Sequence, residues 1–161
     1  MVALKKQRKP ADGFILESFL PYRLSLLSNT VSQGISTAYR RDYGLSVTEW
    51  RIIAVLGRFP GLTASQITER TAMDKVAVSR AVKKLRHQGL VHRSPHRHDR
   101  RRQPMELTAD KGRALFEQVV PKALAYERRL LSKLSEEEIE VLSALLTRLQ
   151  RSAASIDEAS A

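Results

Sequence analysis

The chain has 161 residues, with 28 lysines and arginines against 17 acidic residues, which gives a formal net charge of +11 at pH 7. This length suits one domain or a small domain with appended helices, and the charge favours nucleic acid or another anionic surface as partner. The absence of cysteine excludes disulfides, thiolate metal sites and thiol redox sensing. No apolar run approaches the roughly 18 residues of a membrane span, so we expect a cytoplasmic protein that does not enter a membrane.

The first predicted segment, residues 1–12, is a basic tail. Its cations lie between Lys5 and Lys9, and no hydrophobic segment ending in small residues follows them, so the tail does not resemble a secretory signal. We expect this tail to be disordered. An arm that follows DNA phosphates is the alternative.

Residues 13–44 carry a helical pattern that is interrupted once. Asp12 can cap a helix beginning at Gly13 or Phe14, and Pro21 suits either a kink or the first turn of a new helix. Apolar residues then recur every three or four positions until Gly44, a residue type that commonly ends helices.

Two capping boxes organise the middle of the chain. Ser46 with Glu49 opens a helix that Pro60 and Gly61 close, and Thr63 with Gln66 opens a short helix through about Thr71. After a three-residue turn, Asp74 is placed to cap a longer helix.

The longer helix, over residues 75–85, has an aliphatic underside and a cationic top. Four residues fall on one face, namely Val78, Ala81, Val82 and Leu85. The other face carries one hydroxyl and four cations: Lys75, Ser79, Arg80, Lys83 and Lys84. A short helix, a tight turn and a basic helix make a helix-turn-helix, whose second helix fits the major groove of a duplex.

Two short extended runs around a cationic tip predict a β-hairpin that ends near Leu107, and the pattern as a whole predicts a winged helix-turn-helix over residues 45–107. Residues 58–102 hold twelve lysines and arginines against three acids, whereas an ordinary solvated surface would mix both signs. Arginines at the tip of such a wing would reach the adjoining minor groove or its phosphates.

The C-terminal part reads as two more helices. Thr108 caps a helix to about Lys133 that Pro121 should bend, and Ser135 with Glu138 opens a last helix. We expect residues 153–161 to be frayed. The apolar stripes of residues 13–44 and 108–152 predict a helical dimerisation region, so that a homodimer holds two DNA half-sites about 34 Å apart. The alternative is that the two stripes pack on one another within one monomer.

The order of these parts resembles the MarR family of bacterial transcription regulators. The specific part covers residues 45–113, from Leu45-Ser46-Val47-Thr48-Glu49-Trp50 through Asp99-Arg100-Arg101, and the flanking helices match only in pattern. The resemblance extends over roughly residues 14–150. It implies a winged helix-turn-helix homodimer on double-stranded DNA with a palindromic operator. Family members usually repress, and many release DNA when a small, often phenolic ligand occupies a cleft between the two lobes.

The resemblance also implies site residues. Those facing base edges would be Lys75, Val76, Ala77 and Arg80, and those suited to phosphates Ser79, Lys83 and Lys84. The wing would contribute Arg97, Arg100, Arg101 and Arg102, with Asp99 orienting arginines through a charge-assisted hydrogen bond. Because arginine binds guanine bidentately, Arg80 is the best single candidate for base specificity.

Six residues border the expected ligand cleft between the lobes: Tyr22, Arg23, Asn29, Trp50, Arg51 and Phe59. Arg23 or Arg51 would pair with a carboxylate ligand, and Trp50 would stack on an aromatic one. The alternative is that Trp50 and Phe59 belong to the core and that Arg23 forms a surface or interlobe salt bridge.

The sequence offers three other interpretations: a metal site, an enzyme and an architectural protein. His96 and His98, with His87 and His92 nearby, could indicate a metal site, but cations surround them and no acidic cluster accompanies them, so we expect neither metal nor cofactor. No nucleophile–base pair or paired carboxylates indicate an enzyme. A non-specific architectural nucleic-acid-binding protein is the remaining alternative.

Overall fold

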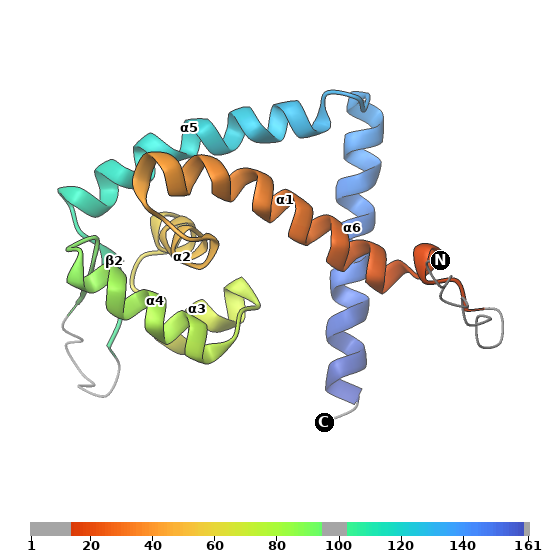
Figure 1. The fold of residues 1–161 in the computed structure, drawn as a ribbon. Coiled ribbons are helices and arrows are strands. Elements are labelled where there is room, and N and C mark those ends of the chain that lie inside the picture. Colours follow the sequence, from red (N-terminus) through yellow and green to blue (C-terminus); the bar gives the residue numbers. More distant parts are fainter. Residues whose placement is uncertain (1–13, 95–102, 160–161) are drawn as a thin grey trace, which may run out of the picture. The chain divides into compact units, whose positions relative to one another are not determined.

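The computed structural model describes residues 14–94 and 103–159 (Figure 1). Its elements, in chain order, are the 3-10 helix η2 (Leu16–Ser18), α1 (Leu20–Tyr43), α2 (Val47–Arg58), α3 (Ala64–Thr71), α4 (Lys75–His87), β1 (Val91–Arg93), β2 (Met105–Leu107), α5 (Lys111–Leu131) and α6 (Glu136–Ala159). The predicted fold class, mainly helical with a small β-hairpin, is confirmed. The chain divides into two compact units within α5, one ending at Phe116 and the other beginning at Glu117.

Helix α2 is the centre of the first unit. It packs against α1, α3, α4 and β2, and it lies between α1 and the α3–α4 pair (Figure 1). Its side chains Ile52, Ile53 and Leu56 are buried together with residues from each neighbouring element. The remaining core residues of this unit are Tyr39, Leu45, Leu62, Ile67, Val78, Ala81, Val82, Leu85, Val91 and Met105.

The three predicted capping boxes are all formed. Ser46 N–H donates to Glu49 Oε2 at 2.8 Å, and Glu49 N–H donates back to Ser46 Oγ at 3.2 Å. The same exchange opens α3 between Thr63 and Gln66. In the second unit, Ser135 N–H donates to Glu138 Oε2 at 2.8 Å and Glu138 N–H to Ser135 Oγ at 3.2 Å. Each box satisfies two backbone donors that have no partner inside the helix.

The hairpin is joined to α4 by a helix-ending turn at Gly89. Gly89 adopts φ 70°, Leu90 N–H donates to Leu85 O and Gly89 N–H to Arg86 O, both at 3.0 Å, which is the Schellman pattern. Strands β1 and β2 pair antiparallel, with Val91 opposite Leu107. The Leu62 segment forms an isolated bridge to Met105 in β2, so the base of the hairpin is tied to the α2–α3 connection.

Two helix boundaries differ from the sequence prediction. The segment from Phe14 is not α-helical, because α1 begins only at Leu20 with Pro21 in its first turn. Proline cannot donate the backbone hydrogen bond that would continue an earlier helix, so of the two predicted roles Pro21 takes the second. At the other end, α6 continues to Ala159 rather than fraying from residue 153. Alanines at 153 and 154, the strongest helix formers, favour this continuation.

Helix α5 runs from Lys111 to Leu131 through Pro121 without a break in its helical assignment. Thr108 caps its start, because Gly112 N–H donates to Thr108 Oγ1 at 2.8 Å. None of the described helices is long and apolar enough to cross a membrane.

Gly112 allows α5 to pack closely against the backbone of Leu90. A Cβ atom added there would lie 2.1 Å from the carbonyl oxygen of Leu90, and this neighbour is backbone that cannot rotate away. We therefore expect Gly112→Ala to lower the free energy of unfolding by about 1–3 kcal/mol, despite the better helix propensity of alanine. Thermal or urea denaturation measures the change. Lys111→Ala, at an exposed neighbouring position, is the control and should change stability little; equal stability of the two variants would contradict the close packing.

Candidate nucleic-acid interface

The rotation of α4 about its own axis is fixed by its aliphatic face. The four residues predicted as the underside are all buried, at 1% (Val78), 7% (Ala81), 6% (Val82) and 0% (Leu85) relative exposure. They pack towards α2 and α3. Because a helix repeats every 3.6 residues, the opposite arc must then point outward. It carries Val76, Arg80, Lys83 and His87, all of them exposed.

The start of α4 is set by Asp74 and by the turn before it. Asp74 Oδ1 accepts hydrogen bonds from Val76 N–H and Ala77 N–H, both at 2.9 Å. Ala72, which ends α3, adopts φ 48°, a left-handed conformation that reverses the chain between the two helices. The turn thus places α4 immediately after α3, as a helix-turn-helix requires.

The predicted recognition residues do not all face the same way. Lys75, Val76, Ser79, Arg80 and Lys83 are exposed, and Ala77 is half-buried. Lys84 differs from these, because its Nζ lies 2.7 Å from Glu49 Oε1, on the flank of α4 that faces α2. The structure therefore gives Lys84 a protein partner where the sequence suggested a phosphate contact.

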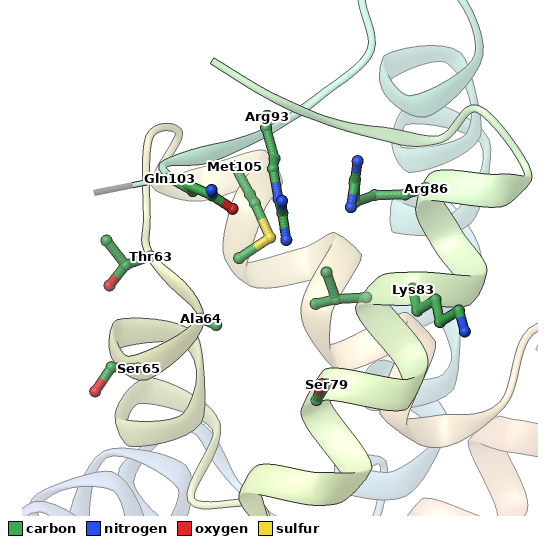
Figure 2. Close-up of a pocket in the computed structure, with 10 residues that line it drawn as sticks. Thr63, Ala64, Ser65, Ser79, Lys83, Arg86, Arg93, Gln103 and Met105 are labelled. Carbon is green, nitrogen blue, oxygen red and sulfur yellow. The ribbon is translucent and has the colours of Figure 1, made fainter. Parts of the chain in front are cut away.

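A cleft of about 720 Å³ lies between α4, the start of α3 and the base of the hairpin. Figure 2 shows the guanidinium groups of Arg86, from α4, and Arg93, from β1, turned toward each other across it, while the Lys83 ammonium points away. Among the residues that the structure describes, neither guanidinium has a carboxylate within salt-bridge distance. The remaining lining residues are Thr63, Ala64, Ser65, Ser79, Val82, Gln103 and Met105.

The chemistry of this Arg86–Arg93 cleft suits an anion. Two like charges that face one another repel unless an anion lies between them. The first turn of α3 forms the opposite wall, and backbone N–H groups in a first turn have no partner within the helix. The hydroxyl groups of Thr63 and Ser65 point away from the two guanidinium groups (Figure 2), and that of Thr63 donates to Gln66 Oε1 at 3.1 Å. The cleft thus places two guanidinium groups opposite a helix start, on the side of α4 next to its outward arc.

Arg86 and Arg93 were not among the residues predicted from sequence. A signal for Arg86 was available, because it lies seven positions after Ser79 and so shares a helix face with it. Arg93 had no such signal, since its place beside α4 depends on how the hairpin folds back. The predicted wing residues Arg97, Asp99, Arg100, Arg101 and Arg102 lie outside the described residues.

The predicted ligand residues are not brought together in one cavity. Tyr22 and Arg23 line a largely apolar groove of about 630 Å³ along α1, and the other four do not line it. Asn29 is exposed on α1. Phe59 is 39% exposed and lies between two guanidinium groups, with the carbon of Arg58 at 5.1 Å and that of Arg70 at 4.3 Å from its ring centre.

Trp50 and Arg51 instead join α2 to α1. The Trp50 ring packs on Tyr39 with 4.8 Å between centroids, and Arg51 Nη2 donates to Ser32 Oγ at 3.1 Å. Burial raises the pKa of Tyr39 to about 12, so its hydroxyl stays protonated at neutral pH. Trp50 is half-buried and packs on Tyr39, which is a core residue. Within residues 14–94 and 103–159, no three histidine or acidic side chains are grouped as metal ligands.

A helix-turn-helix with a buried aliphatic seam, an outward cationic arc and a hairpin anchored beside it defines a winged-helix DNA-binding protein. Comparison with known proteins gives the family. The model of the MarR family matches residues 43–102. The chain is 32% identical over 131 residues to the HTH-type transcriptional regulator PecS of Dickeya dadantii, covering 80% of this chain and 78% of PecS.

Solved structures agree. A MarR/EmrR family transcriptional regulator from Acinetobacter sp. ADP1 superposes with a TM-score of 0.82 at 31% identity, covering 88% of this chain and 99% of that one. Streptococcus pneumoniae FabT, in complex with DNA, gives a TM-score of 0.69 at 25% identity, covering 85% and 96%. The chain belongs to the MarR family, and it is a DNA-binding transcription regulator rather than an enzyme.

The Asp74 cap provides a test of how α4 is begun. Replacing Asp74 by alanine leaves the N–H groups of Val76 and Ala77 without their acceptor, so we expect the free energy of unfolding to fall by about 1 kcal/mol. Asp74→Asn retains a side-chain oxygen at the same place and should keep most of this stability. Chemical denaturation compares the three proteins. The cap assignment fails if the asparagine variant loses as much stability as the alanine variant.

Proposed function

We propose that this protein binds a palindromic operator as a homodimer, reading its sequence with α4, and that it represses transcription until a small ligand releases it. The orientation of α4 is the observation that carries the proposal. Its aliphatic residues are buried, and its outward arc presents cations beside a cleft that two further arginines line. This shape fits the major groove with phosphates on either side.

Base recognition is assigned to the start and middle of the outward arc. Lys75, Val76, Ala77 and Arg80 would lie against base edges, with Arg80 as the bidentate reader of guanine. Ser79 and Lys83 would contact phosphates. At the wing we retain Arg97, Arg100, Arg101 and Arg102 as contacts with the minor groove or its phosphates, with Asp99 orienting them.

The Arg86–Arg93 cleft adds a phosphate site to this set. It lies between α4 and the hairpin, which are the elements that enter adjacent grooves in winged-helix complexes, so a backbone phosphate between the two grooves would pass it. A phosphate placed between the guanidinium groups would remove their mutual repulsion. Such contacts fix the position of the protein without reading sequence.

Homodimer formation is supported by large exposed apolar side chains in both units. Scattered singly they would need no explanation, but here they are grouped near the start of the described chain and along α5 and α6. Near the start of the described chain, outside the groove along α1, they are Phe14, Ile15, Leu16 and Phe19. In α5, α6 and their connection they are Leu124, Leu130, Leu134, Val141, Leu142, Leu145, Leu146, Leu149 and Ile156.

For the ligand, the groove along α1 is the best supported site. Half of its lining residues are leucines, and Tyr22 and Arg23 offer an aromatic ring and a guanidinium group to a small aromatic carboxylate. Repression and release by a ligand are taken from the family resemblance. The competing function, a non-specific architectural protein, would bind any duplex with similar affinity.

The central test compares the affinity of the protein for a palindromic DNA fragment from upstream of a gene with its affinity for random DNA. We expect Arg80→Ala to remove the preference for the fragment, because one bidentate guanine contact contributes about 1–3 kcal/mol of discrimination. We expect Arg86→Ala to weaken binding to both duplexes equally and to lower the salt dependence of binding by about one phosphate contact. Mobility shifts across a salt series give both quantities.

The two variants serve as controls for each other, since both remove one exposed arginine from α4. An unchanged preference in Arg80→Ala would refute its role in base reading, and a changed preference in Arg86→Ala would refute a phosphate role. Equal affinity of the unmodified protein for both duplexes would favour the architectural function.

The dimer has its own test on α6. Leu142→Glu combined with Leu146→Glu places charges on the apolar stripe, and we expect the dimer dissociation constant to rise at least about 100-fold. Ser143→Glu with Thr147→Glu, on the same two turns, is the matched control and should leave it unchanged. Analytical ultracentrifugation measures both. If the leucine variant associates as tightly as the control, α6 does not form the interface.

A further inference from the structure

Glu49 is a buried carboxylate with both oxygens engaged. The residue is 3% exposed at the start of α2. One oxygen, Oε2, accepts from Ser46 N–H at 2.8 Å and completes the capping box. The other, Oε1, lies 2.7 Å from Lys84 Nζ, and the Lys84 side chain is 52% exposed. The capping box alone therefore does not account for Glu49, because a box needs only one oxygen.

The ion pair joins the first turn of α2 to the last turn of α4. The aliphatic seam already holds α4 against α2, but apolar burial is not directional and leaves small rotations and slides inexpensive. A short ion pair on the flank of the helix is directional. Because a buried carboxylate without its partner is strongly unfavourable, rotating Lys84 away from Glu49 carries a penalty that the seam alone does not impose.

We propose that Glu49 is a positioning residue for α4, and that Lys84 acts in DNA reading through Glu49 rather than by contacting a phosphate. Asp74 fixes the first turn of α4 and the Glu49–Lys84 pair fixes its last turn. Between these two points lies Arg80, whose bidentate contact depends on the angle at which it leaves the helix. This inference rests on the proposed function in which α4 reads sequence.

Three variants separate positioning from a phosphate contact. Glu49→Gln keeps an oxygen for the Ser46 cap and removes the charge, Lys84→Met removes the amine but keeps the apolar stem, and Lys84→Arg keeps the charge. Each is compared with the unmodified protein on the palindromic fragment and on random DNA. Mobility shifts across a salt series give the operator preference and the number of phosphate contacts.

Under the positioning role, Glu49→Gln and Lys84→Met each lower the operator preference by about tenfold, with an unchanged salt slope. The double variant loses no more than either single one, because both break the same pair. Lys84→Arg restores most of the preference. If Lys84 instead contacts a phosphate, Lys84→Met weakens binding to both duplexes equally and lowers the salt slope by about one. Glu49→Gln then strengthens binding by removing a negative charge. The second set of results overturns the inference.

Hydrogen exchange at the amides of α4 keeps the test independent of the operator. If the pair positions α4, exchange in the last turn of α4 accelerates in Glu49→Gln and Lys84→Met but not in Lys84→Arg, at temperatures where all three remain folded. Unchanged exchange overturns the inference even if operator preference is lost. If exchange accelerates in these two variants but the unmodified protein shows no operator preference, the proposed function is refuted while the positioning of α4 stands.

Discussion

Burial of the aliphatic face of α4 is the constraint on which the interface depends. Each valine or leucine removed from water contributes about 1.5–3 kcal/mol, whereas an exposed ion pair contributes at most about 1 kcal/mol. The seam of Val78, Val82 and Leu85 therefore decides which way the helix faces. The cations follow from this choice, since a helix that buries one arc must expose the opposite one. The aliphatic residues set which arc of α4 is buried, and the cations on the opposite arc face outward as a result.

Features that depend on residues close in sequence were predictable. The capping boxes at Ser46, Thr63 and Ser135, the Asp74 cap and the glycine end at Gly89 all involve partners within a few positions. Their geometry is that of a single helical turn, so residue type and spacing determine them. The burial of the α4 underside was predictable for the same reason. Even the ambiguity at Pro21 was confined to two local outcomes.

Features that depend on long-range packing were not predictable. Lys84 has the charge and exposure of a phosphate-binding residue, and only the packing of α4 on α2 brings it to Glu49. Arg93 likewise lines the same cleft as Arg86 because the hairpin folds back beside α4 and is tied to Leu62. The six candidate ligand residues were grouped by the expected cleft, yet Phe59 stacks with Arg58 and Arg70, and Trp50 packs on Tyr39. Spacing along the chain contains no information on these partners.

The cations of α4 thus have different surroundings, which the net charge of the chain does not reveal. Arg80 and Lys83 face outward, Arg86 turns into the cleft with Arg93, and Lys84 is held by Glu49. The net charge of +11 attracts any duplex, and salt screens that attraction beyond about 10 Å. Preference for one sequence requires that a few side chains meet base edges at fixed angles. In the proposed function, specificity depends more on the uncharged seam and one buried carboxylate than on the number of positive charges, because these would fix the direction in which Arg80 points.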